Sequence, residues 1–556
     1  MQDAYATEFC ELRTAECSFF NLIDSIWEGE QWNNAPLHRI FSLMRKMNAR
    51  SYLQEPLALN TELKEEKEMA EQRCKGAVDL KAIRLSFFCS FPEDDGWKNE
   101  KRLPNEHLLG YAVVVSLILP DNSHRSYVLE SVLRPPSVVI YNEQDKQPPF
   151  IQPITNYYVH NVRKFETVIG TSDNPRKIPI TGSFFSQQND LTHVCAHAAL
   201  RMAINSSPSP MFQNNSKLTN KQINDILKID FSSPDKSMGH YGEVQPEDRT
   251  GLSVDEIEIV VKTLGGRVIS ADFQRDSSIE YDHFIYPLME SGYPVILCVE
   301  GRNAQKGEQF AHAVSVFGHT MNSDRWGPEA HQGYRDLPVM EYLSAVEWAD
   351  HLIIGDDNYG GYVTLPTDMI RNFIVPTKNP NLHASYAIGI VPKDVILSGY
   401  KAEQVATGIA HDIICSSALD PAGEWLTRMR ESGNNLVCRT LLVSKSTYQE
   451  KLDALLGDNL ATLPIDIRNE IDSLPDFFWV SEFSLPHIYT TNKHKLGDVL
   501  ISADALNDPS NALDAFLFAW FPGYFISSSD LQPKKWHLID HVQLLRSSGE
   551  TGLLEW

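Results

Sequence analysis

Residues 187–202 read Gln187-Gln188-Asn189-Asp190-Leu191-Thr192-His193-Val194-Cys195-Ala196-His197-Ala198-Ala199-Leu200-Arg201-Met202. The first part is polar and predicts a turn, whereas the run 196–203 consists mainly of strong helix formers. Cys195 is therefore expected in the first turn of a helix, where the helix dipole favours a negative charge. A thiol at a helix start and beside an imidazolium has a lowered pKa, and its thiolate is a nucleophile. This stretch predicts a helix that begins at a reactive cysteine.

Two later segments supply the partners that such a thiol needs. An apolar strand carries a histidine and a second apolar strand ends in two acids, in the segments Phe310-Ala311-His312-Ala313-Val314-Ser315-Val316-Phe317-Gly318 and Leu352-Ile353-Ile354-Gly355-Asp356-Asp357-Asn358-Tyr359-Gly360. His312 would take and return a proton, and Asp357 or Asp356 would fix its ring tautomer. The backbone N–H of Cys195 and the side-chain amide of Gln188 would stabilise the oxyanion. Cysteine, histidine and acid follow one another here in the order of a cysteine peptidase.

Each of these residues also has a structural interpretation. A cysteine is more often a small buried apolar residue than a nucleophile, and His312 could be a satisfied core histidine. Asp356 and Asp357 precede a glycine and fit ordinary turn chemistry, and Gln188 could be a solvated loop amide. The catalytic interpretation rests on the combination of order, spacing and local structure.

Residues about 181–370 resemble the papain-like clan of cysteine peptidases, and within it the bacteriocin-processing (double-glycine leader) peptidases. The resemblance rests on Gln188 with the segments 195–202, 312–318 and 357–360, and is extended by Gly251-Leu-Ser253-Val-Asp-Glu256 and Gly292-Tyr-Pro294-Val-Ile-Leu-Cys-Val299. It implies a nucleophile helix packed on an antiparallel sheet. It also implies a Cys195, His312 and Asp357 triad with Gln188 in the oxyanion hole, without a cofactor or a metal ion.

Four features of the sequence depart from that family. Ala196 stands where the family usually has glycine, and the separation of Gln188 from Cys195 is one residue longer, so Gln187 and Asn189 are alternative amide donors. The segment 320–349 is longer than in minimal members, and two aspartates stand where the family has one acid or amide. Asp357 keeps the family's spacing to the aromatic residue and the glycine, whereas Asp356 follows the strand more directly. Asp357 is preferred.

The composition predicts a globular α+β protein of several domains. The chain has 556 residues, of which 42% are hydrophobic and 22% are charged, enough for three or four domains with sizeable cores. We expect an N-terminal α+β region over 1–165, a papain-like core over 166–375 and a C-terminal α+β region over 376–556. Local patterns predict a charged, solvated helix over 60–72, a capping box from Ser253 to Glu256, and a helix near 512–520. The loop 322–337 is expected either to border the cleft or to pack its aromatic residues on a flanking domain.

Charge and cysteine usage limit the partners. A net charge of −24 argues against general binding to nucleic acid or to anionic membranes, and no apolar run reaches the 18 residues of a membrane span. The N-terminus lacks the basic and apolar regions of a secretory signal, and the eight cysteines form no CxxC pair, which favours a reduced, cytoplasmic location. His193, Cys195 and His197 would share a face only on a strand, so zinc is not expected there. The expected partner is a peptide or protein substrate, and the oligomeric state is left open.

The function predicted from the sequence is therefore that of a cysteine peptidase or isopeptidase, which forms a thioester intermediate. An acyltransferase of the same clan shares the first half-reaction and remains an alternative. A catalytically silent binding or regulatory module with the peptidase fold is the alternative from another functional class.

Overall fold

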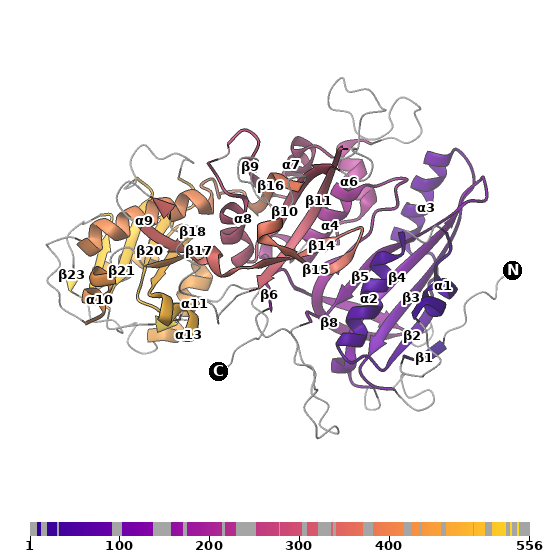
Figure 1. Cartoon of the computed structure of the whole chain (residues 1–556), viewed down its shortest axis with the longest axis horizontal. Helices are drawn as coiled ribbons and strands as arrows, with labels where there is room; N and C mark the ends of the chain where they lie inside the picture. The colour runs from indigo at the N-terminus through magenta and orange to yellow at the C-terminus, as the bar shows by residue number, and fades with distance from the viewer. Residues whose placement is uncertain are drawn as a thin grey trace.

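Helices and mostly antiparallel sheets make up the chain, and three sheets follow one another along its length (Figure 1). The structure is a computed structural model that describes residues 8–12, 19–29, 33–91, 103–136, 157–170, 175–213, 217–229, 252–276, 278–302, 309–320, 335–336, 341–370, 382–415, 424–432, 436–456, 463–492, 494–505, 514–529, 534–535 and 542–543. This arrangement confirms the predicted α+β class. No helix within these ranges is long and apolar enough to cross a bilayer.

The N-terminal sheet has seven antiparallel strands in the order β1 (Glu8–Glu11), β2 (Ser51–Pro56), β3 (Asp79–Phe88), β4 (Leu108–Ile118), β5 (His124–Leu133), β8 (Arg176–Phe185) and β7 (Arg163–Ile169). Its helices are α1 (Phe19–Ile26), α2 (Ala35–Lys46) and α3 (Thr61–Cys74). Alternate residues of β4 enter two different cores, since Val114 packs with α2 whereas Val113 and Val115 pack with α3. A continuous apolar strand is the pattern expected when both faces of a sheet are covered.

The central sheet carries the candidate site. Its order is β15 (Gly360–Pro366), β14 (His351–Asp356), β11 (Gln309–Thr320), β10 (Val295–Arg302), β16 (Leu382–Pro392) and β9 (Gly266–Asp272), with β6 (Tyr157–Val159) also paired to β11. One face packs against α4 (Cys195–Ser206), α6 (Asn220–Leu227) and α7 (Val254–Thr263), through Ile296 and Ile388. The other face packs against α8 (Tyr281–Glu290), through Val295 and Leu297. The short helix α5 (Pro210–Gln213) follows α4.

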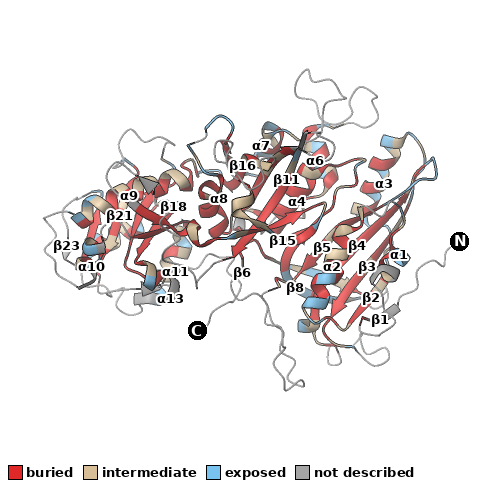
Figure 2. Ribbon diagram, in the orientation of Figure 1, coloured by how far each residue is buried: buried red, intermediate tan, exposed pale blue. Residues whose placement is uncertain are grey.

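The C-terminal sheet shares a core with the central one. Its order is β12 (Arg335–Asp336), β13 (Glu341–Ser344), β17 (Val437–Ser444), β18 (Phe477–Ser484), β20 (Gly497–Ser502), β21 (Phe516–Phe521), β22 (Tyr524–Ser527) and β23 (Lys534–Lys535), and β19 (His494–Lys495) pairs with β24 (Val542–Gln543). Its helices are α9 (Gly399–Cys415), α10 (Glu424–Ser432), α11 (Lys445–Leu456), α12 (Ile465–Asp472) and α13 (Pro486–Asn492). Helices α8 and α9 pack on each other in one apolar cluster, so buried residues continue between the two sheets (Figure 2).

The sheets do not divide at residues 165 and 375, where the sequence predicted domain boundaries. Strands β7 and β8 continue the N-terminal sheet to Phe185, and β16 joins the central sheet after residue 375. In the opposite direction, β13 leaves the central region and pairs in parallel with β17 of the C-terminal sheet. Sequence composition could not reveal these memberships, because strand pairing depends on partners far away in the chain.

Local predictions had mixed outcomes. Ser253 and Glu256 form the predicted capping box, since each side chain accepts a hydrogen bond from the other residue's backbone N–H. The charged helix exists as α3, but its acids are not all solvated, because Glu66 is buried. The prediction of a helix near 512–520 was wrong, because the aromatic residues from Phe516 onward form strand β21, in keeping with their β-propensity.

The described part of the insertion between histidine and acid belongs to the C-terminal region. Tyr342 on β13 is buried, and its hydroxyl donates a hydrogen bond to the Glu403 carboxylate 3.3 Å away. This agrees with packing on a flanking domain rather than with a cleft border. Two aromatic residues of the loop 322–337, Trp326 and Tyr334, lie outside the described residues.

Candidate active site

Helix α4 places Cys195 at its first residue, as the sequence predicted. Val194 is the N-cap and makes no side-chain capping bond, and its carbonyl accepts the backbone N–H groups of His197 and Ala198 at 2.9 and 3.2 Å. Every α4 residue after Cys195 is buried, whereas Cys195 itself is partly exposed. The helix packs against β11 and β8, so its N-terminal end is fixed between two sheets. The site therefore combines an accessible thiol with a rigid support.

The loop before the thiol is held by Asn189. Its Oδ1 accepts hydrogen bonds from the backbone N–H groups of Leu191, Thr192 and His193, at 2.9, 2.9 and 3.3 Å. Its Nδ2 donates to the Thr192 hydroxyl at 2.9 Å. An asparagine that bonds to the following backbone closes a tight turn. Asn189 therefore shapes the approach to Cys195, and its amide is already engaged.

Two acids of helix α3 contact helix α4 and the loop before it. The sequence analysis did not identify these two acids. Arg201 of α4 donates to Glu62 Oε1 at 2.7 Å, and His193 Nε2 lies 3.4 Å from Glu66 Oε2. Burial opposes the charge of Glu66, but the neighbouring His193 and a hydrogen bond from Asn220 outweigh it and lower its pKa to about 2. Glu66 therefore stays ionised. No signal in the sequence links α3 to α4, because these residues are more than a hundred positions apart.

His312 lies between two carboxylates at the end of β14. Its Nε2 is 3.1 Å from Asp356 Oδ1, which accepts the hydrogen bond, and 3.5 Å from Asp357 Oδ1. Asp356 Oδ1 also accepts the backbone N–H of Asn358 at 2.9 Å, which fixes the carboxylate in the turn. Neither carboxylate oxygen of Asp357 makes a hydrogen bond to the described residues, although the side chain is buried. Asp356, rather than the preferred Asp357, thus makes the closer contact with the ring.

The two aspartates of this cluster differ in their electrostatic relation to His312. Burial opposes the charge of His312, but hydrogen bonds with Asp356 and Cys195 and the nearby carboxylates outweigh it and raise its pKa to about 11. Burial raises the pKa of Asp357 to about 7, against the effect of His312. His312 is therefore an imidazolium at neutral pH, and Asp356 is its closer counter-ion.

The histidine lies on a strand that packs against the helix of the thiol, since β11 carries His312 and α4 begins at Cys195. Because Nε2 faces the carboxylates, Nδ1 is the ring atom left for another partner. The tertiary structure thus packs together the elements that carry Cys195, His312 and Asp356, although His312 follows Cys195 by 117 positions and Asp356 follows His312 by 44.

The structure distinguishes the three candidate amides. Gln187 is buried, its Nε2 donates to the carbonyl of Asn33 at 2.8 Å, and its Oε1 accepts the Val128 N–H at 2.9 Å. The Asn189 side chain already makes the hydrogen bonds that close its own turn. Gln188 is only partly buried, and its Nε2 makes a long contact of 3.5 Å with Asn358 Oδ1 in the turn after Asp357. Gln188 is therefore the amide best able to turn toward a ligand.

The other histidines near the thiol do not form a metal site with it. His197 Nε2 lies 3.0 Å from Asn224 Oδ1, and burial lowers the pKa of His197 to about 3, so the ring is neutral. His193 faces Glu66. A different cluster of His312, Asp356 and Asp357 has ligand atoms within 4.8 Å of one another and could hold a cation, in competition with the proton on His312.

Comparison of the chain with known protein-family models and with curated proteins finds no match. A thiol at a helix start, a histidine on the strand packed against that helix, and a carboxylate hydrogen-bonded to the histidine are the groups that nucleophilic acyl transfer needs.

Proposed function

We propose that the chain is a cysteine peptidase or isopeptidase with a papain-like core. The observation that carries this proposal is the position of His312, which is hydrogen-bonded to Asp356 and lies on β11, the strand packed against the helix that begins at Cys195. The packing of α4 against an antiparallel sheet supports the proposed core. The described cysteines are free thiols, which supports the proposed reduced, cytoplasmic location.

In the proposed reaction the thiolate of Cys195 attacks the carbonyl carbon of a peptide or isopeptide bond. A carbon–sulfur bond forms, and negative charge develops on the carbonyl oxygen. The Cys195 N–H and the Gln188 amide would stabilise this charge. Collapse of the intermediate breaks the carbon–nitrogen bond, and the proton of His312 goes to the leaving amine. Water then attacks the thioester carbon and gives one proton to His312, the carbon–sulfur bond breaks, and the carboxylic acid leaves with the Cys195 thiolate and the His312 imidazolium restored.

The test is selective alkylation followed by activity. Iodoacetamide at neutral pH should modify Cys195 faster than the other described cysteines, because the proposal places a helix N-terminus and a catalytic histidine beside this thiol alone. Cys195→Ala should abolish cleavage of a denatured-protein substrate while leaving the melting temperature nearly unchanged. The matched control is Cys298→Ala, because Cys298 lies on β10 in the same apolar cluster and burial raises the pKa of its thiol to about 12.

Two results would count against the proposal. One is alkylation of Cys195 at the rate of an ordinary thiol together with no cleavage, which would favour the catalytically silent binding module. The other is full cleavage activity in Cys195→Ala.

A further inference from the structure

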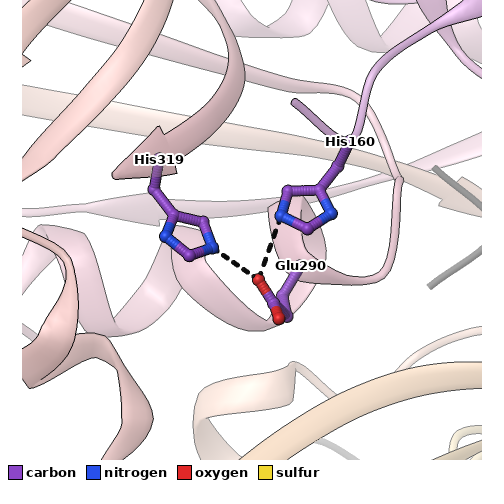
Figure 3. Close-up of side chains that lie close together, drawn as sticks. All are labelled: His160, Glu290 and His319. Carbon is purple, nitrogen blue, oxygen red and sulfur yellow. Dashed lines mark hydrogen bonds and ion pairs between the residues drawn. The ribbon is translucent and has the colours of Figure 1, made fainter. Parts of the chain in front are cut away.

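A second cluster of titratable side chains lies on the opposite part of β11 from His312. Figure 3 shows His160, Glu290 and His319, whose side chains converge from the segment after β6, the end of α8 and the end of β11. All three are buried, with 0%, 4% and 2% of their surfaces exposed. The two imidazole rings are stacked, with centroids 5.2 Å apart and an interplanar angle of 19°. Three separate segments therefore direct polar atoms to one point in the interior.

The converging atoms have the spacing of a set of ligands. Both imidazole Nε2 atoms approach the same carboxylate oxygen, Glu290 Oε2, at 3.1 Å from His160 and 2.7 Å from His319 (Figure 3). The three ligand atoms lie within 4.8 Å of one another. Two donors bound to one zinc ion at about 2.0–2.2 Å in a tetrahedral site are themselves roughly 3.4 Å apart. The three ligand atoms would therefore have to move apart by less than about 1 Å to hold one ion.

The far side of the His319 ring is held by the backbone. Its Nδ1 lies 3.0 Å from the carbonyl oxygen of Thr320, which can only accept a hydrogen bond. This bond turns Nε2 toward Glu290 Oε2. A histidine whose Nδ1–H donates to a backbone carbonyl is a common arrangement for a metal ligand.

The carboxylate is oriented for one ligand bond. Arg439 of β17 donates to Glu290 Oε1 from Nε at 2.9 Å and from Nη2 at 2.5 Å, which leaves Oε2 toward the histidines. Burial opposes the charge of Glu290, but Arg439 and the two histidines outweigh it and hold its pKa well below the usual range. Arg439 is balanced on its other side by Glu482, 3.1 Å from Nη1. The arginine therefore acts as an outer partner of the carboxylate and is not an unpaired cation beside the site.

We propose that His160, His319 and Glu290 bind a divalent transition-metal ion, with zinc as the preferred ion. Two imidazoles and one carboxylate form a known zinc donor set, whereas calcium and magnesium prefer oxygen ligands. A water molecule would complete a tetrahedral site. His319 is seven residues from His312 along β11, about 23 Å at the rise of a strand, so this ion would not touch the candidate active site. Its role is structural, because it ties the segment after β6 and helix α8 to the central sheet.

The test uses the intact full-length protein and zinc alone. Protein purified without chelators should contain about one zinc ion per chain by mass spectrometry of the metal. Removal with 1,10-phenanthroline should lower the melting temperature by at least about 3 °C, and added zinc should restore it. Cobalt(II) in place of zinc should give visible absorption bands of a tetrahedral site with nitrogen and oxygen ligands.

Variants assign the ion to these residues. His319→Gln and His160→Gln should each lose the bound metal ion, whereas His197→Gln should keep it, since His197 is an equally buried histidine bonded to Asn224 elsewhere. If the ligand variants do not fold, the stripped and reloaded wild-type protein decides the question by itself. A wild-type protein that binds no zinc or cobalt and whose melting temperature is unchanged by zinc would overturn the proposal and leave the three side chains as a hydrogen-bonded cluster. Full zinc content in a folded His319→Gln variant would overturn it too.

Discussion

Asp356→Asn should slow the alkylation of Cys195 far more than Asp357→Asn does, although the two residues are adjacent. The first substitution keeps the shape of the side chain but removes the negative charge 3.1 Å from His312 Nε2. Two unit charges at that distance attract by about 5 kcal/mol at an effective dielectric constant of 20. Solvent reaches part of this pair, because 15% of the His312 side chain and 9% of the Asp356 side chain are exposed, and asparagine still offers an accepting oxygen. We therefore expect a net loss of about 1.4–2.8 kcal/mol, or 10- to 100-fold.

The assay is the second-order rate constant of alkylation by iodoacetamide between pH 5 and pH 9, with the modified peptide identified by mass. In Asp356→Asn the His312 imidazolium is less stable, so less of the positive charge that the proposal places beside Cys195 remains. The rate at pH 6 should fall by the factor above. Asp357→Asn should change that rate less than about threefold, because burial raises the pKa of Asp357 to about 7 and the carboxyl carries little charge at pH 6.

A larger effect of Asp357→Asn than of Asp356→Asn would refute this reasoning. It would show that Asp357 orients the histidine despite its longer distance of 3.5 Å. Equal and small effects would show that neither acid controls the ring.

Three further predictions follow from the same geometry. Folding raises the pKa of Asp357 from 3.8 to about 7, so its stabilising contribution is complete below about pH 4 and is lost as the pH rises through 7. In urea unfolding at pH 8.5, the free energy of unfolding of Asp357→Asn should exceed that of the wild type by up to about 4 kcal/mol. At pH 5 this difference between the two proteins should be much smaller. Gln188→Ala should lower kcat/KM of the proposed cleavage by about 100-fold with little change in melting temperature. Gln187→Ala should lower the melting temperature, because it leaves the Val128 N–H without its acceptor. The reverse result would exchange the roles of the two glutamines. Gly355→Ala should lower the free energy of unfolding by about 1–3 kcal/mol, because the new Cβ would lie 2.6 Å from a Phe317 ring atom and 2.8 Å from the Met202 sulfur. An unchanged free energy of unfolding in urea would show that helix α4, which carries Met202, can move away from strand β14.

The sequence by itself determined which residues can carry chemistry and the local structure around them. The helix starting at Cys195, the strand of His312 and the capping box from Ser253 to Glu256 all depend on neighbours within a few positions. Helix propensity, strand patterning and capping are local effects, so they can be read without the fold. The aromatic run from Phe516 onward was misassigned as a helix although its β-propensity indicates a strand.

Only the tertiary structure decided how those residues are used. Asp356 and Asp357 are adjacent, and the bend at the end of β14 brings both carboxylates to His312 but gives the hydrogen bond to Asp356. Glu62 of α3 accepts a hydrogen bond from Arg201 of α4, which lies 139 positions later in the chain, so α3 contacts α4 and is not a fully solvated helix. Such pairings depend on which surfaces the whole chain buries together. A buried charge needs a partner of opposite charge, which can come from any part of the chain. The free energy lost when a buried charge is left unpaired is larger than the free energy gained from local helix or strand preference.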